Sequence, residues 1–528
     1  MISRNSRILK QIDPSILFLA IAILIGGYIR LSKVLQSDFP INDGGLFYNM
    51  TKDLMANDYR LPITTSYNHL NLPFAYPPLF LYLSGFLADL TSWGLINIIR
   101  ILPAIFTVLA IPAFYLLASV LIKNKVQVVL ATYIFTFIPA SFDWLIMGGG
   151  LTRSPAFFLA LLSLYFIYRL YTRNCNQDIL WTTVFSSLTI LTHPETALHT
   201  AASAIVFFLF FGRNKNGLLK SIIVAGLTIL VTAPWWATVL VHNGFTPFIA
   251  AGKTGFYNVE GIFQIFQFNI THEFSLQTIG TLGLIGLFWH IAERKYFVPA
   301  WVFVIFISEP RSAPLYLCPC VAILASYSLT KILQIFNKTT LQTEGENSEP
   351  HPLSSKVSKG VFLLLSGQWI YSSMVTIILL SNTTILPNSD KNAFDWIKIN
   401  TSSQSKFLVL TGNSPLADPI SEWFPALTDR TSIATVQGYE WDSNGSFEEI
   451  LTESLNLQKC ISQTFQCIES WAEKNHHVFD YVYIHNPVQH EDVQIGSSYA
   501  IALGELSLSQ GYTELVYKND AVSIYKVK

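Results

Sequence analysis

Apolar residues form long runs that recur from Pro14 to about Ser381. A run of roughly 17–25 apolar residues is long enough to cross a bilayer as an α-helix. Beyond Ser381 charged residues return, and no later run is long enough to span. The pattern therefore predicts a polytopic α-helical membrane region over 1–384, followed by a soluble α/β domain over 385–528.

We expect about eleven transmembrane helices in the first region. The expected spans are approximately 14–33, 99–122, 126–144, 155–172, 179–191, 196–212, 218–241, 276–292, 296–309, 312–335 and 359–381. The first run, "PSILFLAIAILIGGYI", is too long for the core of a signal peptide and lacks a small-residue cleavage site. It is therefore expected to remain as a membrane anchor.

Basic residues predict the orientation of these spans, because Lys and Arg are enriched in cytoplasmic loops. The residues before the first span include Arg4, Arg7 and Lys10, which places the N-terminus in the cytoplasm. If 34–98 is one long outer loop, the later short basic clusters also fall inside. An odd number of crossings then leaves the C-terminal domain outside, in a multi-pass protein of a plasma or inner membrane.

Two features bear on this orientation. Arg30 and Lys33 lie at the outer end of the first span and go against the rule. The apolar segment 77–95 would reverse the later loops if it crossed, so we expect it to lie on the membrane surface.

The unusual polar motifs all fall on the expected outer face. They are Asp43, "GGGLTRSP" (148–155), "LTHPET" (191–196), the loop 242–275 and "SEPRSAP" (308–314). Ionisable groups at membrane depth are costly and usually face a cavity or one another. The sequence therefore predicts a single polar site at the outer interface.

Composition agrees with a membrane protein and excludes one class of partner. The chain is 51% hydrophobic and 13% charged, whereas about 25% of the residues in a soluble domain are charged. Its formal net charge is −1, which argues against a nucleic-acid partner because such proteins carry basic patches.

Asp43 is followed by two glycines and by the amphipathic segment 46–55. That segment is expected to form a helix in the membrane interface, which would hold the acid at the rim of the membrane. The sequence leaves two interpretations open. Asp43 either caps the helix N-terminus or acts as a general base toward a substrate hydroxyl.

Three short motifs in the first 125 residues occur together. Asp43 is followed by "PPL" (77–79) and by "RILP" (100–103), which leads into an apolar span ending in basic residues. This arrangement resembles the GT-C superfamily of membrane glycosyltransferases, especially the branch with protein mannosyltransferases and lipid A aminoarabinose transferases. The matching residues are Asp43, Pro77, Pro78, Leu79, Arg100, Leu102 and Pro103.

The resemblance implies a glycosyltransferase reaction on the outer face, with a polyprenyl-phosphate-linked sugar as donor. It also implies that Asp43 is the catalytic base or the organiser of the acceptor. Gly44 and Gly45 follow Asp43 where many members have a second acid or an aromatic pair, so the resemblance does not extend to the acceptor contacts. The acceptor, whether glycan, lipid or protein, is left open.

Arg153 and Arg311 are the candidates for the donor phosphate, because they lie on the expected outer side and a guanidinium binds phosphate through two parallel hydrogen bonds. The alternative is that each is a snorkelling anchor or a structural ion pair, with Glu309 or Asp143 as partner.

His193 and Glu195 flank Pro194, and His199 follows one turn later. His and Glu clusters can bind a divalent metal, which makes His193 and Glu195 weak metal candidates. The spacing is not that of an HExxH motif, so a hydrogen-bonded turn lining the cavity is the alternative. The pair His272 and Glu273 is expected to be a solvated polar turn.

The outer loop 242–275 is rich in glycine and aromatic residues and holds Lys253, Tyr257 and Glu260. The resemblance implies that this loop shapes the donor and acceptor cavity, to which we also assign Tyr76, His193, Glu195 and Glu309. The alternative is an aromatic belt that rests on the lipid surface.

The region after residue 385 is predicted to form a mixed α/β domain. Expected strands are 406–412, 432–436, 481–486 and a hairpin that turns at Asn519-Asp520; expected helices lie around 394–397, at 446–461 and at 497–509. The aromatic-rich stretch 421–442 suits either a packed core or stacking on sugar rings. Cys460 and Cys467 are close enough in sequence to pair in an oxidising compartment.

These patterns favour a GT-C-like membrane glycosyltransferase with no certain cofactor. A transporter or flippase is the first alternative, but no internal repeat is evident and the polar motifs avoid the expected midplane. The second alternative is a non-catalytic membrane scaffold with an outer interaction domain.

Overall fold

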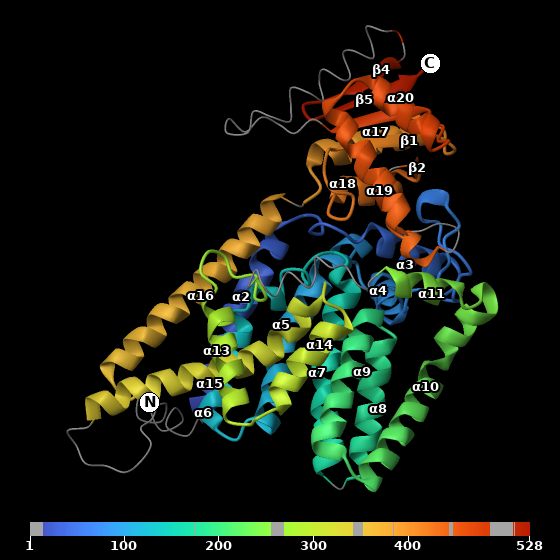
Figure 1. Cartoon of the computed structure of the whole chain (residues 1–528). Coiled ribbons are helices and arrows are strands. Elements are labelled where there is room, and N and C mark those ends of the chain that lie inside the picture. Colours follow the sequence, from blue (N-terminus) through green and yellow to red (C-terminus); the bar gives the residue numbers. More distant parts are fainter. Residues whose placement is uncertain are drawn as a thin grey trace, which may run out of the picture.

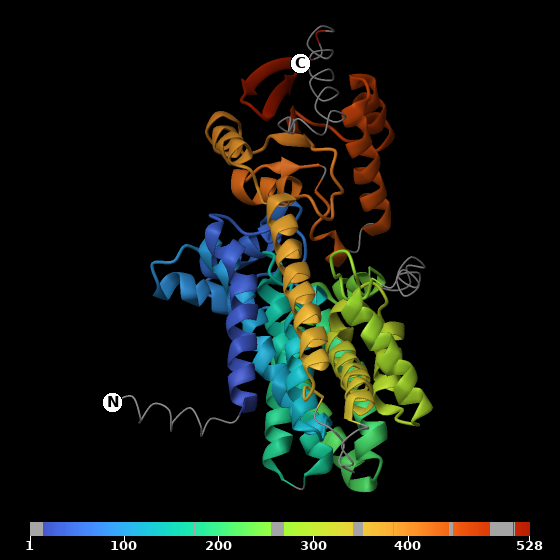
Figure 2. The ribbon, with the colours of Figure 1, turned by 90° about the vertical axis from the view of Figure 1, so that its left-hand side faces the viewer.

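The computed structural model describes residues 14–173, 175–254, 269–341, 352–383, 385–433, 435–442, 447–485, 511 and 513–528. A bundle of long helices occupies one part of the molecule, and a domain with a small sheet lies at one end of it (Figure 1). The same separation is visible after a quarter turn (Figure 2).

Each expected span coincides with one helix. The helices are α2 (Pro14–Gln36), α5 (Leu95–Leu121), α6 (Lys125–Thr136), α7 (Gly150–Thr172), α8 (Gln177–Ile190), α9 (Pro194–Phe207), α10 (Lys215–Asn243), α13 (Thr278–Ala292), α14 (Phe297–Ser308), α15 (Ala313–Leu341) and α16 (Lys356–Thr383). Within the described residues, 7 helices are long and apolar enough to cross a membrane. The chain is thus a multi-pass membrane protein, and the full count of eleven crossings stays a prediction.

The expected span 126–144 is helical over only part of its length. Helix α6 ends at Thr136, and the chain continues through a short 3-10 turn, η2 (Pro139–Ser141). The cause is Pro139, which has no N–H and forces the preceding residue toward an extended conformation; Ile138 has φ −77° and ψ 112°. The loop that follows, 142–149, leads directly into α7.

The buried position of Arg30 explains why this residue departs from the basic-inside pattern. Its side chain is fully buried in the bundle, where it donates to the Gly26 carbonyl and to Ser141 Oγ, both at 3.2 Å. Its guanidinium also lies 4.4 Å from the centre of the Phe142 ring. Arg30 therefore joins α2 to the segment after α6 and is not exposed to either side of the membrane.

The segment between α2 and α5, here called the first loop, contains α3 (Gly45–Ala56), η1 (Tyr67–His69) and α4 (Leu79–Leu90). Helix α3 confirms the amphipathic helix expected there. Helix α4 has 12 residues, about 18 Å at 1.5 Å per residue, which is shorter than the bilayer core. Figure 1 shows α3 and α4 between the bundle and the C-terminal domain.

The C-terminal domain has a five-stranded sheet with the order β2-β1-β3-β5-β4. Its elements are α17 (Asn388–Asn400), β1 (Lys406–Leu410), α18 (Pro419–Thr428), β2 (Thr431–Ser432), α19 (Phe447–Gln458), α20 (Phe465–Lys474), β3 (Tyr481–His485), β4 (Thr513–Lys518) and β5 (Val522–Val527). Strands β2, β1 and β3 are parallel, whereas β3, β5 and β4 are antiparallel. The mixed α/β prediction is confirmed.

Individual elements of this domain differ from expectation. The strand expected at 432–436 is reduced to the two residues of β2, and the chain then leaves the sheet to reach a short 3-10 helix, η4 (Tyr439–Trp441). The helix expected at 497–509 lies outside the described residues. The hairpin is present, and the Asn519 side chain accepts hydrogen bonds from the N–H groups of Ala521 and Val522.

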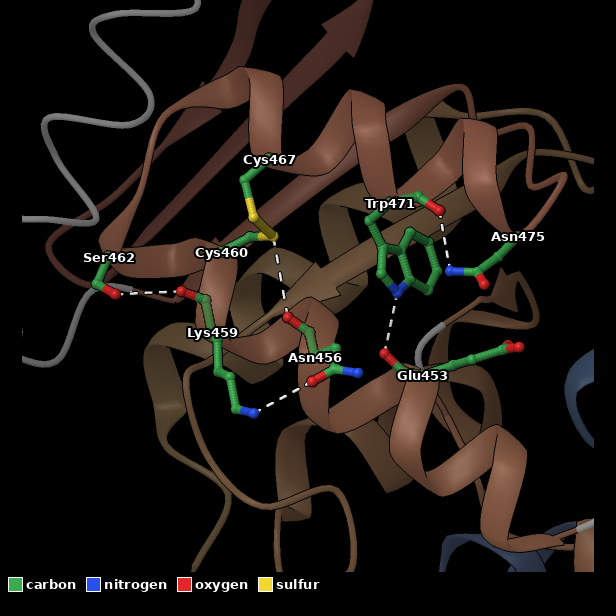
Figure 3. Close-up of a disulfide and its surroundings, with 8 residues drawn as sticks. All are labelled: Glu453, Asn456, Lys459, Cys460, Ser462, Cys467, Trp471 and Asn475. Atoms are coloured by element: carbon green, nitrogen blue, oxygen red, sulfur yellow. Dashed lines mark hydrogen bonds between the residues drawn. A yellow bond between two sulfur atoms is a disulfide. The ribbon is translucent and has the colours of Figure 1, made fainter.

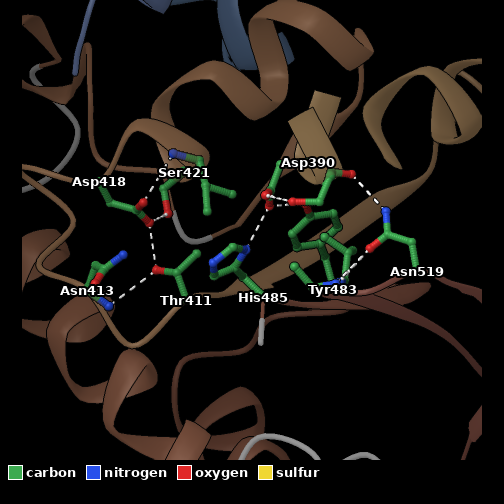
Figure 4. Close-up of polar contacts among 12 residues, drawn as sticks. Asp390, Thr411, Asn413, Asp418, Ser421, Tyr483, His485 and Asn519 are labelled. Atoms are coloured by element: carbon green, nitrogen blue, oxygen red, sulfur yellow. Dashed lines mark hydrogen bonds and ion pairs between the residues drawn. The ribbon is translucent and has the colours of Figure 1, made fainter. Parts of the chain in front are cut away.

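Two buried carboxylates join the elements of the domain (Figure 4). Asp418 caps α18 by accepting from the Ile420 N–H, and it also accepts from Thr411 Oγ1 at 2.6 Å. Asp390 on α17 accepts from the Tyr483 hydroxyl at 2.6 Å and contacts His485 Nδ1 at 2.9 Å. Because Asp418 holds the start of α18 against the end of β1, the helix projects from the sheet in a fixed direction.

Cys460 and Cys467 form a disulfide, as their spacing predicted (Figure 3). It connects η5 (Lys459–Ser462) to α20. The nearby Trp471 indole donates to the Glu453 carbonyl at 2.9 Å, which joins α20 to α19. The disulfide and this hydrogen bond together hold the two helices as one unit.

Candidate functional site

Asp43 is held by the segment that begins α7. Its Oδ1 accepts a 2.7 Å hydrogen bond from the Gly149 N–H, and its Oδ2 accepts from the Arg153 guanidinium. The side chains of Asp43 and Arg153 are 19% and 14% exposed. The acid that lacks a basic neighbour in sequence is therefore neutralised by a residue that lies far along the chain.

The capping interpretation of Asp43 is wrong. The N-cap of α3 is Gly44, with φ 121°, and the carboxylate that accepts from the N–H groups at this helix start is that of Glu422. A glycine is needed there because residues with a Cβ rarely adopt a positive φ. The Asp43 carboxylate thus points away from the helix and toward α7.

Gly148 and Gly149 allow the backbone to approach Asp43. A Cβ at Gly148 would collide with the Asp43 carbonyl, and a Cβ at Gly149 would collide with its carboxylate and with Arg153. The close backbone approach that these glycines permit is to Asp43 itself. The missing side chains of Gly148 and Gly149 therefore leave the space that Asp43 occupies.

Helix α18 of the C-terminal domain lies against the other side of Asp43. Glu422 Oε1 accepts a 2.8 Å hydrogen bond from the Gly44 N–H, and the Trp423 indole donates to the Asn42 carbonyl at 2.9 Å. Burial, followed by the charge of Asp43, raises the pKa of Glu422 to about 8. Residues on both sides of Asp43 are thus fixed by α18.

Tyr76 lies at the centre of a second part of the site. Its hydroxyl is 3.0 Å from Thr152 Oγ1 on α7, and its ring packs edge-on against Phe47 and against Trp441 of the C-terminal domain. Burial raises the pKa of Tyr76, Arg153 opposes the shift, and Glu195 adds to it. The hydroxyl is therefore neutral, and it lies close enough to Arg153 and Glu195 for their charges to act on it.

His193 forms a hydrogen-bonded turn, which was the alternative to metal binding. It is the N-cap of α9, and its Nδ1 accepts from the Thr196 N–H at 3.2 Å. Burial, reinforced by the positive charge of Arg153, lowers the pKa of His193 to about 3. This imidazole stays neutral, and its Nδ1 is already occupied by the hydrogen bond from the Thr196 N–H.

Arg311 faces two carboxylates. Its Nη2 is 3.7 Å from Glu195 Oε2, and its Nε is 3.6 Å from Glu309 Oε1. Both distances are longer than a hydrogen bond, and the Arg311 side chain is 55% exposed. In contrast to Arg153, Arg311 makes only these long contacts to carboxylates.

The group of side chains that could hold a metal ion is not the one expected. Among the described residues it consists of Glu195, His199 and Glu309, whose possible ligand atoms lie within 4.8 Å of one another. It includes Glu195 but not His193.

The loop 242–275 is described only in part. Lys253 is the exposed last residue of α11 (Thr246–Lys253), a helix that packs against η4. Tyr257 and Glu260 lie outside the described residues. The assignment of Lys253 and Tyr257 to the cavity stays a prediction.

Glu273 departs from the solvated turn expected at 272–273. It is buried and accepts from the N–H groups of Ile279 and Gly280, at the start of α13. His272 Nδ1 is 2.7 Å from Asp143 Oδ2, and this contact with Asp143 raises the pKa of His272 against the opposing effect of burial. Glu273 is a structural cap because a buried carboxylate needs donors, and the first turn of a helix supplies them.

The aromatic-rich stretch 421–442 belongs to the packed core. Trp423 is fully buried, and the Arg430 guanidinium donates to four backbone carbonyls, those of Lys398, Thr401, Thr428 and Asp429. These contacts leave neither residue available for stacking on a sugar. The core interpretation is the one that the structure favours.

Sequence reasoning missed Glu422 and Glu440 as neighbours of the site. Burial raises the pKa of Glu440, and the charge of Arg311 opposes the shift, so the acid lies within electrostatic reach of Arg311. Both acids follow the last span by more than thirty residues. One signal was present: each acid precedes a tryptophan in a stretch with few other charges.

No family model and no curated protein matches the chain by sequence, but solved structures share its fold. The archaeal oligosaccharyltransferase AglB from Archaeoglobus fulgidus, in complex with an inhibitory peptide and a dolichol-phosphate, is 14% identical with a TM-score of 0.57, over 97% of this chain and 74% of that one. ArnT from Cupriavidus metallidurans, bound to undecaprenyl phosphate, is 14% identical with a TM-score of 0.54, over 97% of both chains. The mycobacterial arabinofuranosyltransferase AftD is 13% identical with a TM-score of 0.56, over 96% of this chain and 40% of that one.

These neighbours are GT-C superfamily glycosyltransferases, and the fold expected from the first 125 residues is confirmed. At such low identity the likeness is one of fold. The chain therefore has a GT-C-like membrane fold joined to a C-terminal α/β domain.

Proposed function

We propose that this chain is a membrane glycosyltransferase that moves a sugar from a polyprenyl-phosphate-linked donor to an acceptor at the outer face of the membrane. The fold is that of enzymes with such activity, and two neighbours are named as complexes with dolichol-phosphate or undecaprenyl phosphate. The observation that carries the proposal is the position of Asp43, where a partly exposed carboxylate is fixed between α7 and α18.

In this proposal Asp43 activates the acceptor. The acceptor oxygen or nitrogen attacks the anomeric carbon, its proton passes to the Asp43 carboxylate, and the bond from that carbon to the phosphate oxygen breaks. Arg153 and the Gly149 N–H hold the carboxylate at a fixed angle. Such preorganisation avoids the cost of orienting the base during the reaction.

The leaving polyprenyl phosphate needs a positive group, and Arg311 is better suited to this role than Arg153. Arg311 is half exposed and its ion pairs are long, so a phosphate can replace its carboxylate partners. Arg153 is mostly buried, and Asp43 already accepts from its guanidinium. We therefore propose that Arg311 contacts the phosphate, and that Arg153 acts on it through its charge.

The disulfide and the basic clusters support an outer location for the site. A disulfide persists in an oxidising compartment, and Cys460–Cys467 belongs to the domain whose helix α18 contacts Asn42 and Gly44, the neighbours of Asp43. The proposed division of the chain at residue 384 would place both the acid and this domain outside. Tyr76, with its neutral hydroxyl, is proposed to line the acceptor side.

The test is transfer of labelled sugar by the purified protein, given polyprenyl-phosphate sugars and membrane extract as the source of acceptor. Asp43→Asn should lower transfer by at least about 100-fold, the range for loss of a general base. Asp38→Asn is the matched control, because Asp38 lies in the same loop and is 73% exposed, with Lys391 as its partner. The control should transfer sugar at close to the wild-type rate.

Both variants should keep the elution profile and melting temperature of the wild type within a few degrees. Full transfer by Asp43→Asn would remove the catalytic assignment. No transfer by the wild type with any polyprenyl-phosphate sugar, in extracts that support related transferases, would favour the transporter or scaffold alternatives.

A further inference from the structure

A second group of polar residues lies beside the proposed phosphate arginine. Glu195 and His199 are one turn apart at the start of α9, and Glu309 follows the last residue of α14. One ligand atom from each of the three lies within 4.8 Å of the others. Residues 4 apart on a helix face the same side, which is why Glu195 and His199 both point toward Glu309.

The side chains of this group have polar atoms without partners. His199 is 2% exposed and Glu309 is 3% exposed, yet His199 Nδ1 and Glu309 Oε1 have no hydrogen-bond partner in the described part of the chain. A buried polar atom that is left unpaired costs about 1–3 kcal/mol. The cost is removed if these atoms have a ligand that is neither a side chain nor a backbone group.

Charge points to a cation as that ligand. Glu195 and Glu309 are two carboxylates, and the nearby positive group, Arg311, stays more than 3.5 Å from both. The Ser312 hydroxyl donates to Glu309 Oε2 and lies 3.1 Å from His199 Nε2. One hydroxyl has a single proton to donate, so Ser312 cannot satisfy two carboxylates.

We propose that Glu195, His199 and Glu309 bind a divalent transition-metal ion. Two carboxylate oxygens and one imidazole nitrogen are a ligand set that suits Zn²⁺ or Mn²⁺, and three protein ligands leave a position for water or substrate. The imidazole is oriented by its stack on Tyr316, with ring centres 4.0 Å apart. Glu195 is 27% exposed at its side chain, which gives the ion a route in from solvent.

Metal binding at this site has a consequence for Arg311. The ion and the guanidinium use the same two carboxylates, so they compete. A bound cation would release Arg311 toward solvent, where it can meet a phosphate. This consequence rests on the proposed function, whereas the metal site itself does not.

The test uses the full-length protein in detergent, stripped with EDTA and then dialysed against Zn²⁺ or Mn²⁺ in separate samples. We expect about one equivalent of metal per chain by mass spectrometry, together with a rise in melting temperature that EDTA reverses, because a ligand that binds only the folded state stabilises it. Mg²⁺ and Ca²⁺ should give a smaller rise, since both prefer sites built from oxygen alone.

Variants separate a metal site from a simple polar cluster. His199→Asn, Glu309→Gln and the milder Glu195→Gln should each retain less than about one tenth of the metal, as expected for loss of one of three ligands. His290→Asn is the matched control, since His290 is also a buried histidine in the helical bundle but contacts the Gly286 carbonyl on its own helix. It should bind as much metal as the wild type.

Arg311→Gln gives a result that a structural ion-pair cluster does not predict. Removing the competing guanidinium should tighten metal binding several-fold, whereas a simple cluster would lose stability and bind no metal. The proposal is overturned if the stripped wild type takes up no Zn²⁺ or Mn²⁺, or if Glu195→Gln retains as much as the control. Neither outcome depends on sugar transfer, so failure here is distinct from failure of the proposed function.

Discussion

The backbone N–H of Gly44 donates a 2.8 Å hydrogen bond to Glu422, across the boundary between the first loop and the C-terminal domain. The acceptor is buried, and its carboxyl pKa is raised to about 8, first by burial and then by Asp43. We therefore expect the docking of α18 beside the acid to depend on the protonation of Glu422.

The first prediction concerns pH. A raised carboxyl pKa means that the folded state holds the proton more tightly than the unfolded chain, so this stability is complete below the ordinary value of 4.5 and is lost as pH rises toward about 8. Wild-type melting temperature should fall across this window, because the shift corresponds to a loss on the order of 5 kcal/mol of unfolding free energy at about 1.4 kcal/mol per pKa unit. Glu422→Gln should flatten the fall, since its amide does not titrate. Scanning fluorimetry checks this, with Glu449→Gln on the exposed face of α19 as control. Parallel pH curves for wild type and Glu422→Gln would contradict it.

Gly149→Ala should displace the acid without removing it. Its new methyl group would collide with the Asp43 carboxylate and Arg153, so either the carboxylate or α7 must move. A shift of about 1 Å at a catalytic group can cost about 100-fold in rate. Gly94→Ala is the control because nothing lies within 4 Å of a Cβ there. Sugar-transfer rates of the two variants check this prediction. Equal rates for Gly149→Ala and Gly94→Ala would show that the close approach of Gly149 to Asp43 is not needed.

Asp43 and Arg153 should act as a unit. If Arg153 mainly orients Asp43, then Asp43→Asn removes nearly all that Arg153 contributes, and adding Arg153→Gln has little further effect. A double-mutant cycle on transfer rate should show a coupling of about 0.5–3 kcal/mol, the range for residues in one ion-pair network. Strictly additive losses would mean that Arg153 has a separate role, such as direct contact with the donor phosphate.

Trp423→Ala should loosen the C-terminal domain from the first loop. The ring is fully buried, packs edge-on against Phe39 at 4.7 Å, and its indole donates to Asn42. Loss of such a side chain costs about 3–5 kcal/mol. Trp396→Ala, which removes a partly buried ring packed on Tyr517, should cost less. Limited proteolysis within residues 384–388 and melting temperature together check the difference.

The disulfide gives a test of sidedness. Closing a loop of this size is worth about 2–3 kcal/mol, so Cys460→Ser should lower the stability of the C-terminal domain by that amount. In intact cells, a thiol-reactive probe should leave Cys460 and Cys467 unlabelled until a reductant is added. Labelling of both without reductant would indicate a reducing compartment and would contradict the outer placement of the domain.

The helices were largely predictable, because a membrane span shows its length directly in the sequence. The 126–144 span failed at its end, where Pro139 stops α6 and η2 begins. The contacts of Asp43 were not predictable, since Gly149, Arg153 and Glu422 are separated from it by more than one hundred residues. Local patterns left His193 open between a hydrogen-bonded turn and a metal ligand, because a capping and a metal-binding histidine look the same in sequence; in the structure its ring nitrogen caps α9.

The position of Asp43 between α7 and α18 has a consequence for biosynthesis. The acid leaves the ribosome early, Gly149 and Arg153 follow after four α-helices (α3 to α6), and Glu422 arrives only near the end of translation. During most of synthesis Glu422 is not yet present. A truncated product that lacks the C-terminal domain would therefore contain Asp43 but not the contacts that α18 makes beside it. Assembly of the surroundings of Asp43 is thus a late event, completed only when the last domain folds back onto the first loop.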